Sequence, residues 1–82
     1  MLMNLENLKA LLDAEDVDPA AYSLDGGMPF EAYVLERRSS DWAVYYSERG
    51  LRSGEVVFQT EDDACAHLLD LVLRDSTTRR QP

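Results

Sequence analysis

The stretch from Glu31 to Thr60 reads EAYVLERRSSDWAVYYSERGLRSGEVVFQT. It contains three runs that are rich in aromatic and β-branched residues, a composition typical of β-strands. These runs are Glu31–Arg37, Trp42–Ser47 and Gly54–Thr60. Only short connections join them, whereas parallel strands need a crossover of about a dozen residues or more. The stretch therefore predicts three antiparallel strands in a meander.

Helical patterns flank these strands on both sides. Between Asn4 and Glu15 the leucines recur every three or four residues, so they share one helix face, and Asn4 suits the N-cap. Asp18 and Pro19 predict one short helical turn that ends near Tyr22. Thr60 suits the cap of a final helix with an acidic first turn. We expect a two-layer α+β fold of helix–three-stranded antiparallel meander–helix, with both helices on one face of the sheet.

The length of 82 residues suits one small domain, because domains usually have ~100–200 residues. We expect residues 1–75 to form this single α+β domain. Residues 76–82 contain no apolar side chain, which predicts a flexible C-terminal tail.

The charge of the chain limits its partners. Sixteen acidic residues stand against eight basic ones, for a formal charge of −8. This balance argues against nucleic acid or an anionic membrane as the main ligand, since both attract a surplus of Lys and Arg. No apolar run is long enough for a membrane span, and the first residues lack the basic start of a signal peptide. We therefore expect a cytoplasmic protein that binds neither nucleic acid nor membrane.

Few residues could carry chemistry. His67 has Asp63 and Asp70 at helical spacing, which could hold a weak divalent ion, but a solvent-facing histidine is the favoured interpretation. Cys65 falls on the apolar face of the final helix, which favours a buried structural cysteine. A single cysteine also excludes an internal disulfide. We predict no catalytic residue, no cofactor and no metal, and therefore no enzyme.

The sheet leaves two registers open. If Val44 and its alternate neighbours Trp42 and Tyr46 face the helices, Tyr45 points to an open face beside two valines. The other register buries Tyr45 and exposes Trp42 with Tyr46. In both cases two helices cannot cover both faces, so aromatic surface is left over. An ordinary mixed sheet face is the favoured interpretation of this surface, and a partner-binding surface is the alternative.

The acidity is concentrated at the front of the chain. The first thirty residues hold six acidic residues and one basic residue. Two interpretations stay open for the carboxylates around residues 13–18: a solvated helix end, or an acidic patch that meets a basic protein.

Three further stretches carry a resemblance. They are Tyr22-Ser23-Leu24-Asp25-Gly26-Gly27, Tyr45-Tyr46-Ser47-Glu48-Arg49-Gly50 and Phe58-Gln59-Thr60-Glu61-Asp62-Asp63-Ala64-Cys65. Together they resemble small acidic immunity proteins of bacterial polymorphic-toxin and contact-dependent growth inhibition systems, over roughly residues 5–75. The resemblance implies a cytosolic protein that binds one cognate toxin domain and blocks it.

This resemblance and the charge lead to one functional expectation. We expect a non-catalytic immunity protein that binds and neutralises a basic toxin domain, for which a nuclease is one candidate. An acidic inhibitor suits such a target because its charge steers it to a basic site. The alternative is a small regulatory or assembly module acting through homodimerisation; alone, the chain is expected to be a monomer or weak homodimer. The predicted partner-binding residues are Asp13, Glu15, Asp16, Asp18, Asp25, Tyr45, Glu48 and Arg49. For Glu48 and Arg49 a solvated strand terminus stays open as an equal alternative.

Overall fold

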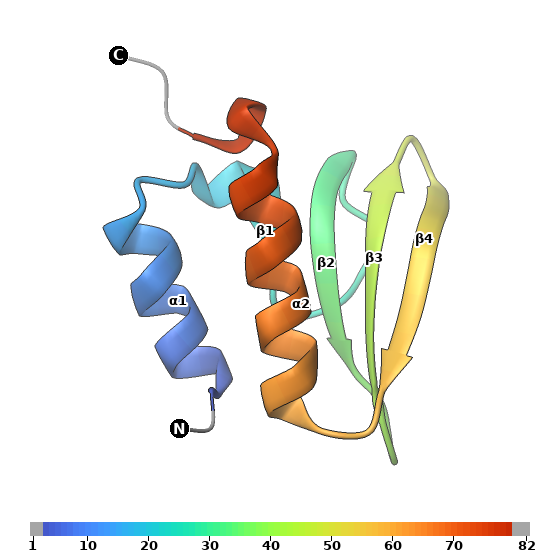
Figure 1. The fold of residues 1–82 in the computed structure, drawn as a ribbon. Coiled ribbons are helices and arrows are strands. Elements are labelled where there is room, and N and C mark those ends of the chain that lie inside the picture. The colour runs from blue at the N-terminus through green and yellow to red at the C-terminus, as the bar shows by residue number, and fades with distance from the viewer. Residues whose placement is uncertain (1–2, 80–82) are drawn as a thin grey trace.

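The computed structural model describes residues 3–79. Two helices and a four-stranded mixed sheet form an α+β fold (Figure 1). In chain order the elements are α1 (Leu5–Ala14), the 3₁₀ turn η1 (Pro19–Ala21), β1 (Tyr22–Ser23), β2 (Glu31–Arg37), β3 (Trp42–Glu48), β4 (Leu51–Phe58), α2 (Glu61–Arg74) and the 3₁₀ turn η2 (Ser76–Thr78).

Both helices begin at the predicted caps. The Asn4 side chain accepts a hydrogen bond from Asn7 N at 2.8 Å, and the Asn7 side chain accepts one from Asn4 N at 3.3 Å. At the start of α2, the Thr60 hydroxyl accepts from Asp63 N at 3.2 Å. These bonds satisfy backbone donors that the first turn of a helix leaves without a partner.

The sheet has the order β1-β2-β3-β4, and the three long strands form the predicted antiparallel meander. The expectation of only three strands is wrong, because Tyr22 and Ser23 form a fourth strand that runs parallel to β2. A two-residue strand has no measurable alternation of polar and apolar residues, so the sequence pattern could not reveal it.

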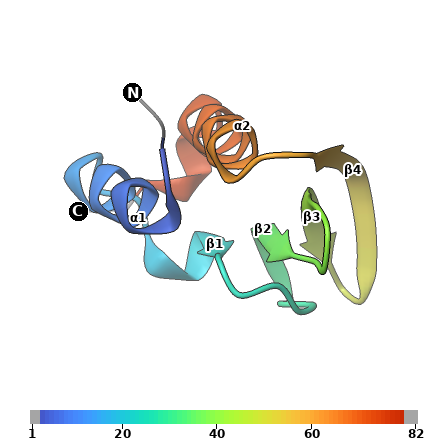
Figure 2. The same ribbon diagram turned by 90° about the horizontal axis from the view of Figure 1, so that it is seen from below.

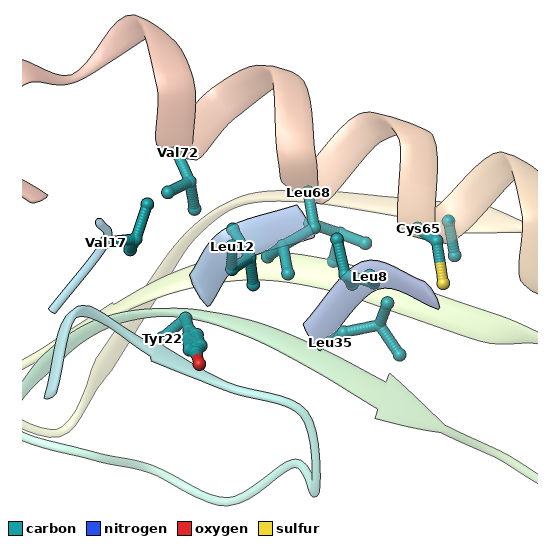
Figure 3. Close-up of a cluster of buried hydrophobic side chains, with 10 residues drawn as sticks. Leu8, Leu12, Val17, Tyr22, Leu35, Cys65, Leu68 and Val72 are labelled. Carbon is teal, nitrogen blue, oxygen red and sulfur yellow. The ribbon is translucent and has the colours of Figure 1, made fainter. Parts of the chain in front are cut away.

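Both helices lie on the same side of the sheet, which we call the helix face (Figure 2). The core lies between the two helices and the sheet. Leu8 and Leu12 of α1 and Leu68 of α2 are fully buried there. Leu35 of β2 closes this core from below (Figure 3), and Val44 of β3 belongs to the same buried cluster. The predicted placement holds for α2, which lies over the long strands, whereas α1 packs on α2 beside the β1 edge of the sheet (Figure 2).

The opposite side of the sheet, the loop face, is covered by the connection between β1 and β2 (Figure 2). Val34, Ala43 and Tyr45 form a second, fully buried cluster there. The Tyr45 hydroxyl donates to Gly27 O at 2.7 Å. The register with Val44 on the helix face is therefore correct, but the expected open face with an exposed Tyr45 is wrong.

The segment after α2 folds back onto the domain. Asp75 caps η2, and the buried Thr78 hydroxyl donates to Val72 O at 2.9 Å. Arg79 then forms an isolated antiparallel bridge with Val17. The expectation of a flexible tail is therefore corrected for residues 76–79. This segment has no apolar side chain, but hydrogen bonds of its polar groups hold it against the domain. Residues 80–82 lie outside the described part of the chain.

Candidate partner-binding surface

The acidic residues predicted to bind a partner surround the end of α1 and the turn η1. The side chains of Asp13, Glu15, Asp16 and Asp18 are all exposed. Several also have local roles: Asp13 lies 3.4 Å from Lys9 Nζ, and Glu15 lies 3.6 Å from the Arg79 guanidinium. Exposed ion pairs of this kind contribute little to stability, so most of this negative charge faces water.

A groove of about 680 Å³ runs between α1 and the segment around β1. It brings Asp13 and Asp25, which are far apart in sequence, into one hollow with Tyr22. Lys9 also lines it, and the nearby Tyr22 and Asp13 raise the pKa of this amine. The groove therefore presents several carboxylates with a single basic residue that stays charged.

A second hollow, of about 290 Å³, lies between η1, η2 and the helix face of the sheet. We call it the tyrosine cavity, after Tyr33 and Tyr46, whose ring centres are 4.9 Å apart. Three carboxylates line it, from Asp18, Glu31 and Asp75, and among residues 3–79 no basic side chain does. The cavity is thus a negatively charged pocket with aromatic walls.

Hydrogen bonds order one wall of the tyrosine cavity. The Tyr33 hydroxyl donates to Asp75 Oδ2 at 3.0 Å, and burial together with this contact raises the pKa of Tyr33 to about 12. Hydrogen bonds from Thr77, and then the one from Tyr33, lower the pKa of Asp75. Tyr33 is consequently a neutral donor and Asp75 a carboxylate at physiological pH.

Glu48 and Arg49 lie at the β3–β4 hairpin, at the end of the sheet where β2 begins. Glu48 is the register partner of both Glu31 on β2 and Leu51 on β4. Arg49 has a positive φ of 50°, its backbone N–H donates to Phe30 O at 2.8 Å, and its guanidinium lies 6.0 Å from the Phe30 ring centre. Through Glu31, this end of the sheet is continuous with the tyrosine cavity.

Sequence reasoning missed the most exposed apolar side chains. Phe30 is 67% exposed and Leu51 is 73% exposed, and both lie at this same end of the sheet. The available signal was their position: each stands in or beside a turn, where polar residues normally serve. A single exposed apolar residue is common on protein surfaces, so these two indicate a contact site only because both lie at the same end of the sheet.

Tyr45 is removed from the set of possible contact residues. Its ring is fully buried, and the Arg52 guanidinium lies 4.3 Å from the ring centre. An ion-pair network covers this region, in which Arg38 and Arg52 each contact Glu36 and Glu55 at 2.9–3.7 Å. Tyr45 therefore supports the loop and has no exposed surface to offer.

Cys65 and His67, the two residues considered for catalysis or metal binding, both pack against other residues of the domain. Cys65 is fully buried, as predicted, and burial raises the pKa of its thiol to about 11. His67 is half-buried and its ring packs on Phe58, with ring centres 5.1 Å apart. Within residues 3–79, no three histidine, cysteine or acidic side chains are arranged to hold a metal ion. No helix in that range has the length and apolar character needed to cross a membrane.

Comparisons of this chain with protein-family models, with curated proteins and with solved structures find no match. The case for a function therefore rests on the geometry and charge described above.

Proposed function

We propose that this chain is a non-catalytic protein-binding module, an immunity protein of a bacterial polymorphic-toxin system that binds and neutralises a basic toxin domain in the cytoplasm. The observation that carries the proposal is the distribution of charge around η1. Two hollows flank this turn, and their six carboxylates are accompanied by one basic lining residue within residues 3–79.

This distribution suits the inhibition of a basic protein. A surface of one sign steers an oppositely charged partner toward it and raises the rate of association. If the toxin cleaves nucleic acid, its active site must attract phosphates, and the same positive charge would attract these carboxylates.

The first test is a growth assay. The open reading frame next to the gene for this chain is induced with and without the chain. Relief of toxicity only on co-expression supports the proposal, whereas a harmless neighbouring product, or toxicity that the chain leaves unchanged, contradicts it.

The second test measures association of the purified pair by stopped-flow fluorescence at several salt concentrations. The double variant Asp13→Asn/Asp25→Asn removes two charges from the groove beside α1. The matched control Asp63→Asn/Asp70→Asn removes two exposed charges from α2. We expect slower association for the groove variant alone, and a difference that shrinks as salt screens the charges.

A second candidate function is supported by β4. This strand is at the edge of the sheet, and its two valines, Val56 and Val57, are 40% and 44% exposed. An exposed edge can pair with the same edge of a second copy, which would make the chain an assembly module. Light scattering during size-exclusion chromatography tests this: a monomer at high micromolar concentration rules it out, and a dimer that Val57→Lys dissociates supports it.

A further inference from the structure

The end of the sheet where β2 and β4 begin is left open by the helices. Helix α2 ends at Arg74, and the chain then turns away through η2 toward α1 (Figure 1). The outermost row of the sheet, formed by Glu31, Glu48 and Leu51, is consequently exposed. We call this row, together with Phe30, the sheet-end patch.

The sheet-end patch combines two features that a free surface rarely has. Phe30 and Leu51 are the two most exposed large apolar side chains in residues 3–79. Glu31 and Glu48 stand directly opposite each other, and neither forms an ion pair within the described chain. Like charges in cross-strand register are destabilising. Arg49, also at this end, has its guanidinium 6.0 Å from the Phe30 ring centre but forms no ion pair with Glu31 or Glu48 that would offset their repulsion. The exposed apolar surface and the facing carboxylates would both be relieved by a partner that is partly apolar and positively charged.

The tyrosine cavity adjoins this patch through Glu31, which belongs to both. The cavity is also lined by the carboxylates of Asp18 and Asp75. Together with Glu31 they place three negative charges beside the two tyrosine rings. The planar guanidinium of arginine both stacks on aromatic rings and donates to carboxylates in pairs, so it matches this composition better than a lysine ammonium does.

We infer that the sheet-end patch and the tyrosine cavity together form the docking site for the basic partner, which inserts one arginine side chain into the cavity and places separate apolar side chains against Leu51, in register with Glu48, and against Phe30, beside Glu31. This inference rests on the proposed function and names the surface and the anchoring contact. It moves the centre of the interface from the groove beside α1 to the opposite side of η1.

The cavity is tested on the isolated protein by NMR. The ¹⁵N-labelled chain is titrated with the peptide acetyl-Leu-Arg-Gly-amide and with the same peptide carrying citrulline, which has the shape of arginine without its charge. We expect amide shifts at Tyr33, Tyr46 and Thr77 with the arginine peptide only. Glu31→Gln should weaken binding about two- to fivefold, while the control Asp70→Asn, an equal charge change on α2, should leave it unchanged.

Three results would overturn the cavity assignment. They are shifts that gather around Lys9 in the other groove, equal shifts with the citrulline peptide, and equal weakening by Glu31→Gln and Asp70→Asn. The last would mean that net charge alone attracts the peptide.

The apolar part of the site is tested with the toxin identified by co-expression. The double variant Phe30→Ala/Leu51→Ala should lower the affinity at least about tenfold, as expected for central apolar contacts. The matched control is Leu11→Ala, since Leu11 is 41% exposed on α1. If the toxin binds this double variant as tightly as the parent, the inference is wrong and the proposed function stands. If no neighbouring toxin exists, the proposed function fails, and the peptide titration still decides whether the cavity binds arginine.

Discussion

The two faces of the sheet are closed in different ways. On the helix face, apolar side chains of both helices, such as Leu12 and Leu68, meet Leu35 and Val44 of the strands. On the loop face, a connection without regular structure is held by a few directed bonds, chiefly the one from the Tyr45 hydroxyl. The helix face is therefore stabilised by a large buried core, and the loop face by a small buried cluster around Tyr45 together with single hydrogen bonds. Loss of those hydrogen bonds should have a smaller and more local effect than loss of a core side chain.

The largest effect should come from the helix face. Leu68→Ala removes a fully buried side chain from the centre of the core and should lower the free energy of unfolding by about 2–5 kcal/mol. Urea denaturation followed by Trp42 fluorescence measures this. The control Leu51→Ala changes an exposed leucine and should stay within about 0.5 kcal/mol. Equal losses in the two variants would contradict the difference drawn between core and surface.

The loop face comes next. The double variant Tyr45→Phe/Ser47→Ala removes the hydroxyl groups that bind Gly27 O and Pro29 O, each at 2.7 Å. We expect a loss of about 1–3 kcal/mol and faster hydrogen exchange in the covering loop. The control Tyr46→Phe/Ser53→Ala makes the same changes at neighbouring positions on the helix face. If the loop exchanges equally slowly in both variants, the hydroxyl groups do not hold it.

A third effect depends on pH. Hydrogen bonds from Thr77 and Tyr33 hold the pKa of Asp75 below its ordinary value of 3.8, so its carboxylate stabilises the folded state at every pH above about 4. This contribution is lost as the pH falls through the folded-state pKa. Asp75→Ala should therefore lower stability by about 1 kcal/mol at pH 7. The gap to the parent chain should narrow as the pH falls below about 4, whereas a constant gap would mean that the carboxylate charge is irrelevant.

The smallest effect should come from the ion pairs over Tyr45. Glu36→Gln removes contacts with Arg38 at 2.9 Å and Arg52 at 3.7 Å, and all three side chains are partly exposed to solvent. Any loss of stability should vanish near 1 M salt, where the screening length is about 3 Å. Thermal unfolding at low and high salt measures it, and a loss that persists at high salt would assign Glu36 a packing role against the loop instead.

Patterns of apolar residues predicted the helix face well and the loop face poorly. The bounds of β2 were predicted at Glu31 and Arg37, and both helix caps were identified, because caps and alternation are local properties. The start of β4 was predicted at Gly54 but lies at Leu51. Gly54 and Glu55 form a bulge opposite Tyr45, and the positive φ of 62° at Gly54 interrupts the alternation.

The candidate site was predictable only in part. The pattern identified which strand residues share a face, but it could not reveal that a loop covers Tyr45. Hydrogen bonds to Gly27 O depend on the path of a glycine-containing connection, which leaves no periodic signal. The acidic residues at the end of α1 were found from composition, yet the approach of Asp25 to Asp13 depends on the chain reversal at η1.

Helix α1 also has a consequence for the order in which the chain folds. Its N-terminal end is fixed to α2 by the hydrogen bond from Met3 N to Asp62 Oδ1, across 59 positions of sequence, and the chain beyond its other end is fixed by the bridge from Val17 to Arg79. Helix α1 therefore has its partners among residues made much later. Its leucines stay in water until α2 follows, and contacts of such long range slow the search for the native state. The β2–β4 meander, whose pairings are local, can form before either helix docks.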